Sequence, residues 1–187
     1  MNYLDLDINL SREDMMLKQN AHEFAKKVMR PVAKELDEMT PEQVIAKDSP
    51  FWDFMKKAYS LGYHSILIPD AYGGMGLSSL QQAIVYEELA WGSVGLTVAL
   101  GVASFHAFGA SMVPEETMID EILVPFCECD DASIIGCWGI TEPDHGSDTL
   151  VPFYPCFSDN CIPSPCVATP DGDDYILSGQ HSAGVSC

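Results

Sequence analysis

The residues best suited to chemistry lie in one short segment. Residues 137–148 read Cys-Trp-Gly-Ile-Thr-Glu-Pro-Asp-His-Gly-Ser-Asp, so a β-branched run leads into a turn with hydroxyl groups, a Glu-Pro pair and a Gly-Ser-Asp sequence. Backbone N–H groups around Gly146 can converge on one acceptor, glycine permits close approach, and Ser147 adds a hydroxyl. The segment therefore suits a polar or anionic cofactor, although a Gly-Ser-Asp sequence is more often only a turn.

Charge is distributed unevenly along the chain. The 187 residues carry a net charge of −19, all nine Lys and Arg lie between Arg12 and Lys57, and seventeen Asp and Glu follow Lys57. Such a surface repels nucleic acid and anionic membranes, so we expect neither as a partner. A general adaptation to solubility or salt and a functional role are equally open explanations of this acidic excess. At 47% hydrophobic residues the chain can still bury a core.

The seven cysteines follow no pattern that we can assign to a metal. Cys156, Cys161 and Cys166 are spaced by five, no Cys-x-x-Cys occurs, and Cys127 and Cys129 are too close for easy chelation, so we predict no metal site. An odd cysteine number argues against a disulfide framework. The acidic N-terminus lacks the basic and apolar regions of a signal peptide, and we expect a cytoplasmic protein.

Helical periodicity dominates the first two thirds of the chain. The first helix is predicted from Ser11, an N-cap with Asp14 three residues on, and Pro31 should kink or briefly interrupt it. Residues 94–113 are about as long as a membrane span, but glycines and His106 interrupt them, so we interpret them as a core helix. The predicted helices begin at Ser11, Ser49, Ser78 or Ser79, Ser93 and Pro114, and the last ends at Pro125.

The periodicity changes from helical to strand-like after Asp131. Residues 134–140 and 175–177 predict two strands, the second after an Asp-Gly-Asp turn, with an irregular Pro- and Cys-rich stretch at 151–170 between them. Two strands do not make a stable sheet, so the β-region must be unfinished or completed by another chain. We therefore divide the chain into an N-terminal helical domain, residues 1–127, and a partial β-domain, residues 128–187.

Four motifs, in order, resemble the acyl-CoA dehydrogenase family over essentially the whole chain. The opening helix contains Arg-Pro-Val-Ala from Arg30, and residues 69–77 read Pro-Asp-Ala-Tyr-Gly-Gly-Met-Gly-Leu, followed by Glu-Glu-Leu-Ala from Glu87. Ile-Thr-Glu-Pro-x-x-Gly-Ser-Asp from Ile140 is similar to the family's flavin-binding signature, and residues 172–180 follow as a Gly-Asp-Asp to Gly-Gln strand. The resemblance implies an α+β fold: an all-α N-terminal domain, then an incomplete β-barrel-like domain, without the family's C-terminal helical domain.

The resemblance also implies roles for single residues and a cofactor, FAD. Trp138, Gly139, Ile140 and Thr141 would border the flavin ring, with the Thr141 hydroxyl on its pyrimidine edge. Gly146 and Ser147 would lie by the flavin diphosphate, and Ser147 also by the acyl-CoA entrance. We expect Glu142 to fix a Glu-Pro corner, Asp148 to be a turn or cap residue, and His145 to face solvent.

The sequence departs from the family where the second flavin segment should follow. The family's tryptophan falls on Ala183 or Gly184, while Ser186 retains a hydroxyl for the cofactor. The family's catalytic glutamate belongs to the C-terminal domain, so we assign no catalytic residue here. The resemblance implies α,β-dehydrogenation of an acyl-CoA thioester, a place in fatty acid metabolism, an electron-transfer flavoprotein as acceptor, and a homo-oligomer or a complementing C-terminal chain. The alternative is a truncated, non-catalytic helical binding module.

Overall fold

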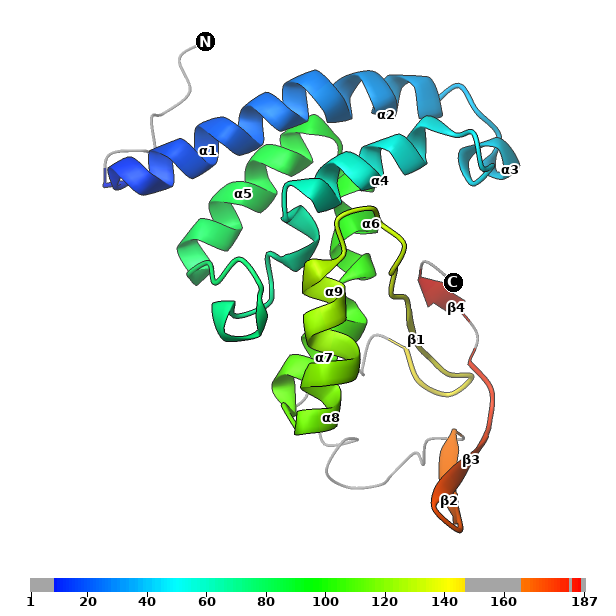
Figure 1. The fold of residues 1–187 in the computed structure, drawn as a ribbon. Coiled ribbons are helices and arrows are strands. Elements are labelled where there is room, and N and C mark those ends of the chain that lie inside the picture. The colour runs from blue at the N-terminus through cyan, green and yellow to red at the C-terminus, as the bar shows by residue number, and fades with distance from the viewer. Residues whose placement is uncertain (1–8, 147–165, 182, 186–187) are drawn as a thin grey trace. The chain divides into compact units, whose positions relative to one another are not determined.

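The computed structural model describes residues 9–146, 166–181 and 183–185 of the chain (Figure 1). The chain divides into two compact units, Met1–Gly136 and Cys137–Cys187. All the helices among the described residues belong to the first unit, and all the strands belong to the second. This confirms the predicted fold class, a helical N-terminal domain followed by the start of a β-domain.

The opening helix is built from three consecutive helical segments. α1 spans Arg12–Phe24, a π-helical turn spans Ala25–Met29, and α2 spans Arg30–Leu36. At its start, Ser11 Oγ accepts a hydrogen bond from the Asp14 N–H at 3.1 Å, and the Asp14 carboxylate accepts one from the Ser11 N–H at 3.0 Å, so the predicted N-cap is confirmed. Because proline donates no hydrogen bond and its ring crowds the preceding turn, the wider π-turn just before Pro31 lets the helix continue through it.

The same arrangement recurs at the end of the helical unit. α8 spans Glu116–Met118, a π-helical turn spans Ile119–Leu123, and α9 spans Val124–Glu128. The prediction that Pro125 ends this helix is therefore wrong. Pro125 stands in the first turn of α9, where its missing N–H has no intrahelical partner to lose, directly after the π-turn.

The segments between these ends begin at capped positions. Ser78 Oγ accepts a hydrogen bond from the Gln81 N–H, and the Gln81 side chain accepts one from the Ser78 N–H, so Ser78 rather than Ser79 is the N-cap of the third predicted helix. A short helix capped by Thr40 was not predicted. The segments are α3 Pro41–Val44, α4 Pro50–Ser60, 3₁₀ turns at Tyr63–Ser65 and Asp70–Tyr72, and α5 Ser79–Gly92.

The long apolar stretch forms two helices, so the prediction of one core helix is wrong. α6 spans Val94–Ala103 and α7 spans Phe105–Met112, with a bend of 45° between them. At the break the Ser104 hydroxyl donates to the Gly101 carbonyl at 2.6 Å, which competes with regular helical bonding. No single helix among the described residues is long and apolar enough to span a membrane, although α6 and α7 taken together have the required length and composition.

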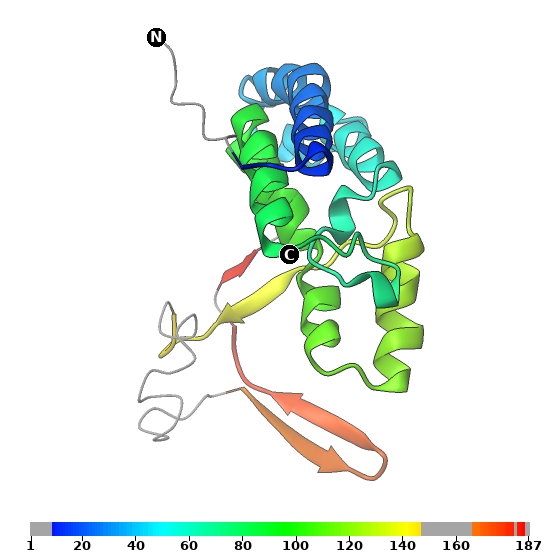
Figure 2. The same ribbon diagram turned by 90° about the vertical axis from the view of Figure 1, so that its left-hand side faces the viewer.

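The core of the helical unit lies between α1, α4, α5 and the helices that follow (Figures 1 and 2). α5 crosses close to the π-turn, since a Cβ on Gly92 would come within 2.8 Å of Ala25 Cβ. Polar side-chain contacts join α1 and α5: Gln81 donates to the Asp14 carboxylate at 3.1 Å, and His22 Nδ1 lies 2.7 Å from the Glu88 carboxylate. The largest fully buried side chains include Tyr59, Phe54, Phe126, Met29, Met55, Ile66, Ile68, Leu89, Leu100 and Leu123.

The chain after α9 stays attached to the helical unit as far as Gly136. The Tyr59 hydroxyl donates to the Ile134 carbonyl at 2.8 Å, and the Gly136 N–H donates to the Ala103 carbonyl at 2.9 Å. Gly136 is buried, and a Cβ there would come within 2.8 Å of the Ala103 oxygen. These contacts place the end of the first compact unit at Gly136, later than the domain boundary predicted after residue 127.

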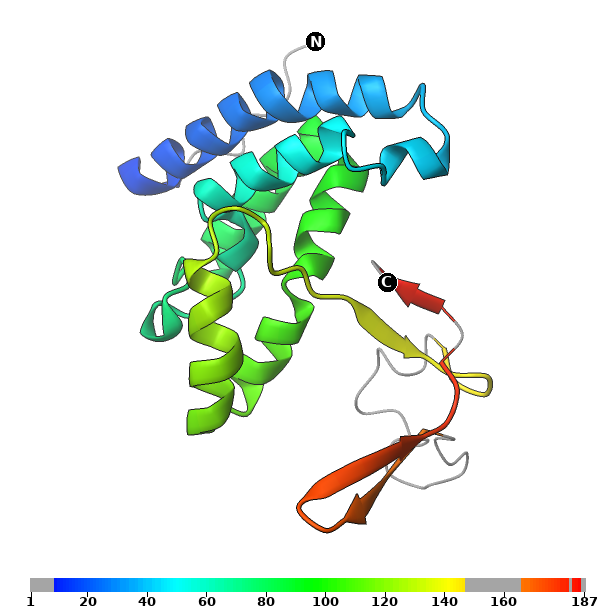
Figure 3. The ribbon, with the colours of Figure 1, turned by 45° about the vertical axis from the view of Figure 1, so that its right-hand side comes forward.

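The second unit contains two antiparallel pairs of strands (Figure 3). β1 Trp138–Thr141 pairs with β4 Ala183–Val185, and β2 Val167–Asp171 pairs with β3 Asp174–Ser178 across a turn in which Gly172 has a φ of 66°. β3 confirms the second predicted strand. β2 falls partly in the stretch predicted to be irregular, and β1 begins at Trp138 rather than near Ile134. Every residue of the β2–β3 hairpin is exposed, so the described part of this unit lacks a core of its own.

Candidate functional site

The Glu-Pro pair forms a closed turn at the end of β1. The Glu142 N–H donates to the His145 carbonyl at 3.0 Å, and the His145 N–H donates to the Glu142 carbonyl at 3.3 Å. Pro143 follows Glu142 in this turn, where its fixed φ favours a reverse turn. Thr141 and Gly146 therefore flank a hydrogen-bonded corner, and the expected corner role of Glu142 is confirmed.

Five of the seven predicted cofactor residues lie together on this strand and turn. Trp138, Ile140, Thr141 and Gly146 are partly buried, and Gly139 is exposed. No atom lies within 4 Å of the position that a Cβ would take at Gly139 or Gly146, so packing within the chain does not require glycine at either position. The two others, Ser147 and Ser186, lie outside the described residues, and so does Asp148.

The second segment that the resemblance assigns to flavin lies beside the first. β4 pairs with β1, with Val185 opposite Trp138 and Ala183 opposite Thr141, and the ladder is irregular between these pairs. The segments are more than forty positions apart in the sequence, and the sheet makes them neighbours. Ala183 and Gly184, where the family's tryptophan falls, are both in β4.

These residues fit a flavin ring better than they fit a diphosphate. A strand edge, the Thr141 hydroxyl and two glycines without a neighbouring atom offer polar groups and close approach to a flat ring. A diphosphate needs positive charge or several converging N–H groups, yet the chain has no Lys or Arg after Lys57. Cations for the phosphates would have to come from outside residues 58–187.

The motifs in the helical unit that carry the resemblance have structural roles. Gly73 and Gly76 have φ values of 86° and 60°, which favour glycine, and a Cβ on Gly74 would come within 2.1 Å of the Ile68 carbonyl oxygen. Glu88, from the Glu-Glu-Leu-Ala sequence, contacts His22 at 2.7 Å and Lys18 at 3.9 Å. The loop and α5 thus hold the helical unit together.

Two histidines lie in the same unit, away from the strand and turn residues in the sequence: His64 is buried and His106 is partly buried. The His64 ring stacks on Tyr59 at 4.1 Å, and its Nε2 lies 3.0 Å from the Phe126 carbonyl. The His106 ring packs edge-on against Phe126 at 4.7 Å. Burial lowers the pKa of both imidazoles. Their ring contacts are with core residues, which is typical of packed histidines rather than of catalytic bases.

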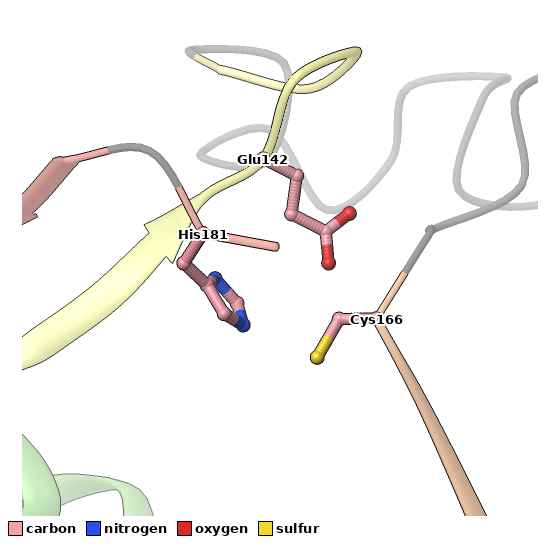
Figure 4. Close-up of side chains that lie close together, drawn as sticks. All are labelled: Glu142, Cys166 and His181. Atoms are coloured by element: carbon pink, nitrogen blue, oxygen red, sulfur yellow. The ribbon is translucent and has the colours of Figure 1, made fainter. Parts of the chain in front are cut away.

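One grouping of side chains was not predicted from the sequence. Glu142, Cys166 and His181 point toward one another, with one carboxylate, thiol or imidazole atom of each within 4.8 Å of the others (Figure 4). Their spacing in the chain, 24 and 15 residues, matches no ligand motif. Only the pairing of the strands could have revealed them.

Comparison with known proteins supports the resemblance. The sequence model of the acyl-CoA dehydrogenase N-terminal domain matches residues 11–120. The glutaryl-CoA dehydrogenase of Desulfococcus multivorans is 28% identical over 179 residues, which cover 95% of this chain and 41% of that protein. The chain spans about two-fifths of the length of the first curated relatives that it matches.

Solved structures show the same likeness. A glutaryl-coenzyme A dehydrogenase in complex with glutaryl-CoA is 27% identical, with a TM-score of 0.66 over 93% of this chain and 39% of that one. An acyl-CoA dehydrogenase from Bacillus anthracis complexed with FAD has a TM-score of 0.67 over 91% of this chain and 26% of that one, and at 19% identity it shows the fold alone. Because the N-terminal-domain model matches more than half of its residues, the chain belongs to the acyl-CoA dehydrogenase family.

Proposed function

We propose that this chain supplies the helical domain and the first flavin-binding segment of an FAD-dependent acyl-CoA dehydrogenase. The observation that carries the proposal is the closed Glu142–His145 turn, which sets Thr141 and Gly146 on either side of one corner, in the order of the family's flavin signature. Family membership supports the cofactor, since the likeness extends to a solved acyl-CoA dehydrogenase complexed with FAD. Relatives of the chain include dehydrogenases of glutaryl-CoA and of short-chain acyl-CoA. FAD, when bound, supplies the acceptor for the hydride that leaves the β-carbon of the thioester.

Each residue of the segment has a part in this proposal. Thr141 would donate a hydrogen bond to the pyrimidine edge of the ring, and Trp138, Gly139 and Ile140 would border it. Gly146 would let the diphosphate approach the backbone at the end of the turn, with cations supplied from outside residues 58–187. Ser147 and Ser186 would add hydroxyl groups, and Ser147 would also line the acyl-CoA entrance.

We further propose that the chain by itself binds FAD poorly and does not oxidise acyl-CoA. A diphosphate adds negative charge to a region with no Lys or Arg and with seventeen carboxylates after Lys57. The exposed β2–β3 hairpin gives the described part of the second unit no core to hold a cofactor rigidly. Removal of an α-proton needs a positioned base, and we assign that role to no residue of the chain.

A complementation experiment tests this proposal. The 187-residue chain is purified alone and after co-expression with the part of the Desulfococcus multivorans glutaryl-CoA dehydrogenase that lies beyond the matched region. Bound flavin and its bleaching by acyl-CoA are measured at moderate salt. We expect a colourless chain alone, and flavin in the co-purified assembly. Stoichiometric FAD with substrate-dependent bleaching in the chain alone would contradict the inactivity, and Glu142 would be the first base to mutate.

Thr141→Ala tests the cofactor assignment within any assembly that binds FAD. Loss of one hydrogen bond should weaken FAD binding by about 0.5–1.5 kcal/mol. Thr169→Ala is the matched control, because Thr169 lies in the exposed strand β2 and has no part in the proposed site. Equal FAD affinities for the two variants would count against the role of Thr141.

The alternative function, a non-catalytic helical binding module, rests on the helical unit. That unit has its own core, which reaches from Ala21 to Cys129. A stable, helical and colourless protein that takes up no FAD in any assembly would favour it. The enzyme proposal also includes three further expectations. They are an electron-transfer flavoprotein as acceptor, a homo-oligomer or a complementing C-terminal chain, and a cytoplasmic location.

A further inference from the structure

Three potential metal ligands converge in the second unit, outside the residues assigned to flavin. Glu142 opens the turn after β1, Cys166 precedes β2, and His181 follows β3. Their carboxylate, sulfur and imidazole atoms lie within 4.8 Å of one another, and the side chains are directed into one small space (Figure 4). Glu142 is buried, Cys166 is half-buried and His181 is exposed. Cys166 is present as a thiol.

Two independent strand pairings bring these residues together. In the β2–β3 hairpin, Val167 lies opposite Ser178, so the chain entering at Cys166 and the chain leaving toward His181 run side by side. In the other sheet, Thr141 lies opposite Ala183, which places Glu142 close to the segment that contains His181. His181 is thus the link between the two pairs of strands, and the cluster follows from the backbone register.

The donor set suits zinc. Thiolate, imidazole and carboxylate bind Zn²⁺ at about 2.3, 2.0 and 2.1 Å, so tetrahedral ligand atoms lie roughly 3.4 Å apart. Ligand atoms within 4.8 Å of one another stand at most about 1.4 Å farther apart than in such a site, and side-chain rotations of the three residues can close that difference. On binding, the Cys166 thiol loses its proton to solvent. One thiolate and one carboxylate then neutralise the ion, in a part of the chain that has no Lys or Arg.

We propose that Glu142, Cys166 and His181 bind one Zn²⁺ ion, with water in the fourth position. The ion would join the β2–β3 hairpin to the Glu-Pro turn. Every residue of the hairpin is exposed, and two-stranded sheets are marginally stable, so a bound metal supplies the cross-link that packing does not. The site does not depend on flavin, and it departs from the expectation of no metal site drawn from cysteine spacing.

Metal titration of the reduced, chelator-treated 187-residue chain tests the site. Zn²⁺ is measured by competition with a chromophoric chelator, and Co²⁺ by its thiolate charge-transfer band. The ligand variants are Glu142→Gln, Cys166→Ser and His181→Gln. The matched controls are Cys137→Ser, an exposed thiol outside the cluster, and His145→Gln, a histidine in the same turn.

We expect one Zn²⁺ per chain in the unmodified protein and in both controls. Each ligand variant should lose more than about 100-fold in affinity, since loss of an outer-shell partner alone costs about 10–100-fold. Zn²⁺ should also slow hydrogen exchange in the β2–β3 hairpin. Far-UV circular dichroism monitors the separate helical unit, so a ligand variant with unchanged helicity has lost the metal site and not the fold. Equal Zn²⁺ affinity in Cys166→Ser, or a cobalt–thiolate band that persists in it, would overturn the proposal.

Discussion

Replacing Gly74 with alanine tests how closely the loop at residues 73–76 packs on the chain before it. Gly74 does not have a positive φ, so alanine meets no backbone penalty there. The obstacle is space: a Cβ would lie 2.1 Å from the Ile68 carbonyl oxygen, 2.5 Å from its carbon and 2.6 Å from Ile68 Cβ. Ile68 is 1% exposed and belongs to the core, and its carbonyl already accepts the Gly76 N–H at 3.2 Å.

The cost follows from the movement that this contact requires. An ordinary contact needs at least 3.4 Å, so loop and core must separate by more than an ångström. Overpacking of this kind costs about 1–3 kcal/mol, and the rigid backbone on both sides puts Gly74→Ala at the upper end, about 3 kcal/mol. For a chain of this length that lowers the melting temperature by about 6–12 °C.

Gly101→Ala provides the matched control. Gly101 lies within α6, and no atom lies within 4 Å of the position of its Cβ. Alanine there should stabilise the protein by about 0.5–1 kcal/mol through helix propensity. Urea unfolding followed by far-UV circular dichroism measures both variants in the 187-residue chain. If Gly74→Ala unfolds at the same urea concentration as the unmodified chain while Gly101→Ala is stabilised, close approach is not the reason for this glycine.

Three further predictions concern the helical unit. Burial lowers the pKa of His64 and His106, so as the pH falls the unfolded chain takes up protons on these histidines before the folded chain does. The free energy of unfolding should therefore fall as the pH drops through about 6.5, the ordinary histidine pKa. Histidine pKa values at or above about 6.5 by NMR would contradict this. Ser11→Ala should cost about 1 kcal/mol in urea unfolding by removing the N-cap of α1, and no change would argue against the cap. Tyr59→Phe should cost about 1 kcal/mol by leaving the Ile134 carbonyl without its donor, and faster hydrogen exchange near Gly136 should accompany it.

Local features of the fold could be predicted from the sequence because neighbouring residues determine them. Ser11 with Asp14, Ser78 with Gln81 and Ser49 before Pro50 mark helix starts, since each cap is completed within three residues. The Glu142–Pro143 corner is equally local. Proline was predicted to kink or briefly interrupt the helix at Pro31 and to end the helix at Pro125, but a π-turn before each proline widens the helix and lets it continue. Sequence periodicity does not reveal that widening.

Long-range contacts were decided only by the tertiary structure. β2 escaped prediction because all five of its residues are exposed, so it has no alternating buried face to detect. The first unit extends to Gly136 because Tyr59 and Ala103, both distant in sequence, hold that segment. Glu142, Cys166 and His181 meet through two strand registers, whereas spacing rules assume ligands close together in the chain. The sequence by itself therefore determined the family, the helix starts capped by Ser11, Ser49, Ser78 and Ser93, and the turn chemistry. The register of the strands determined which distant side chains share a site.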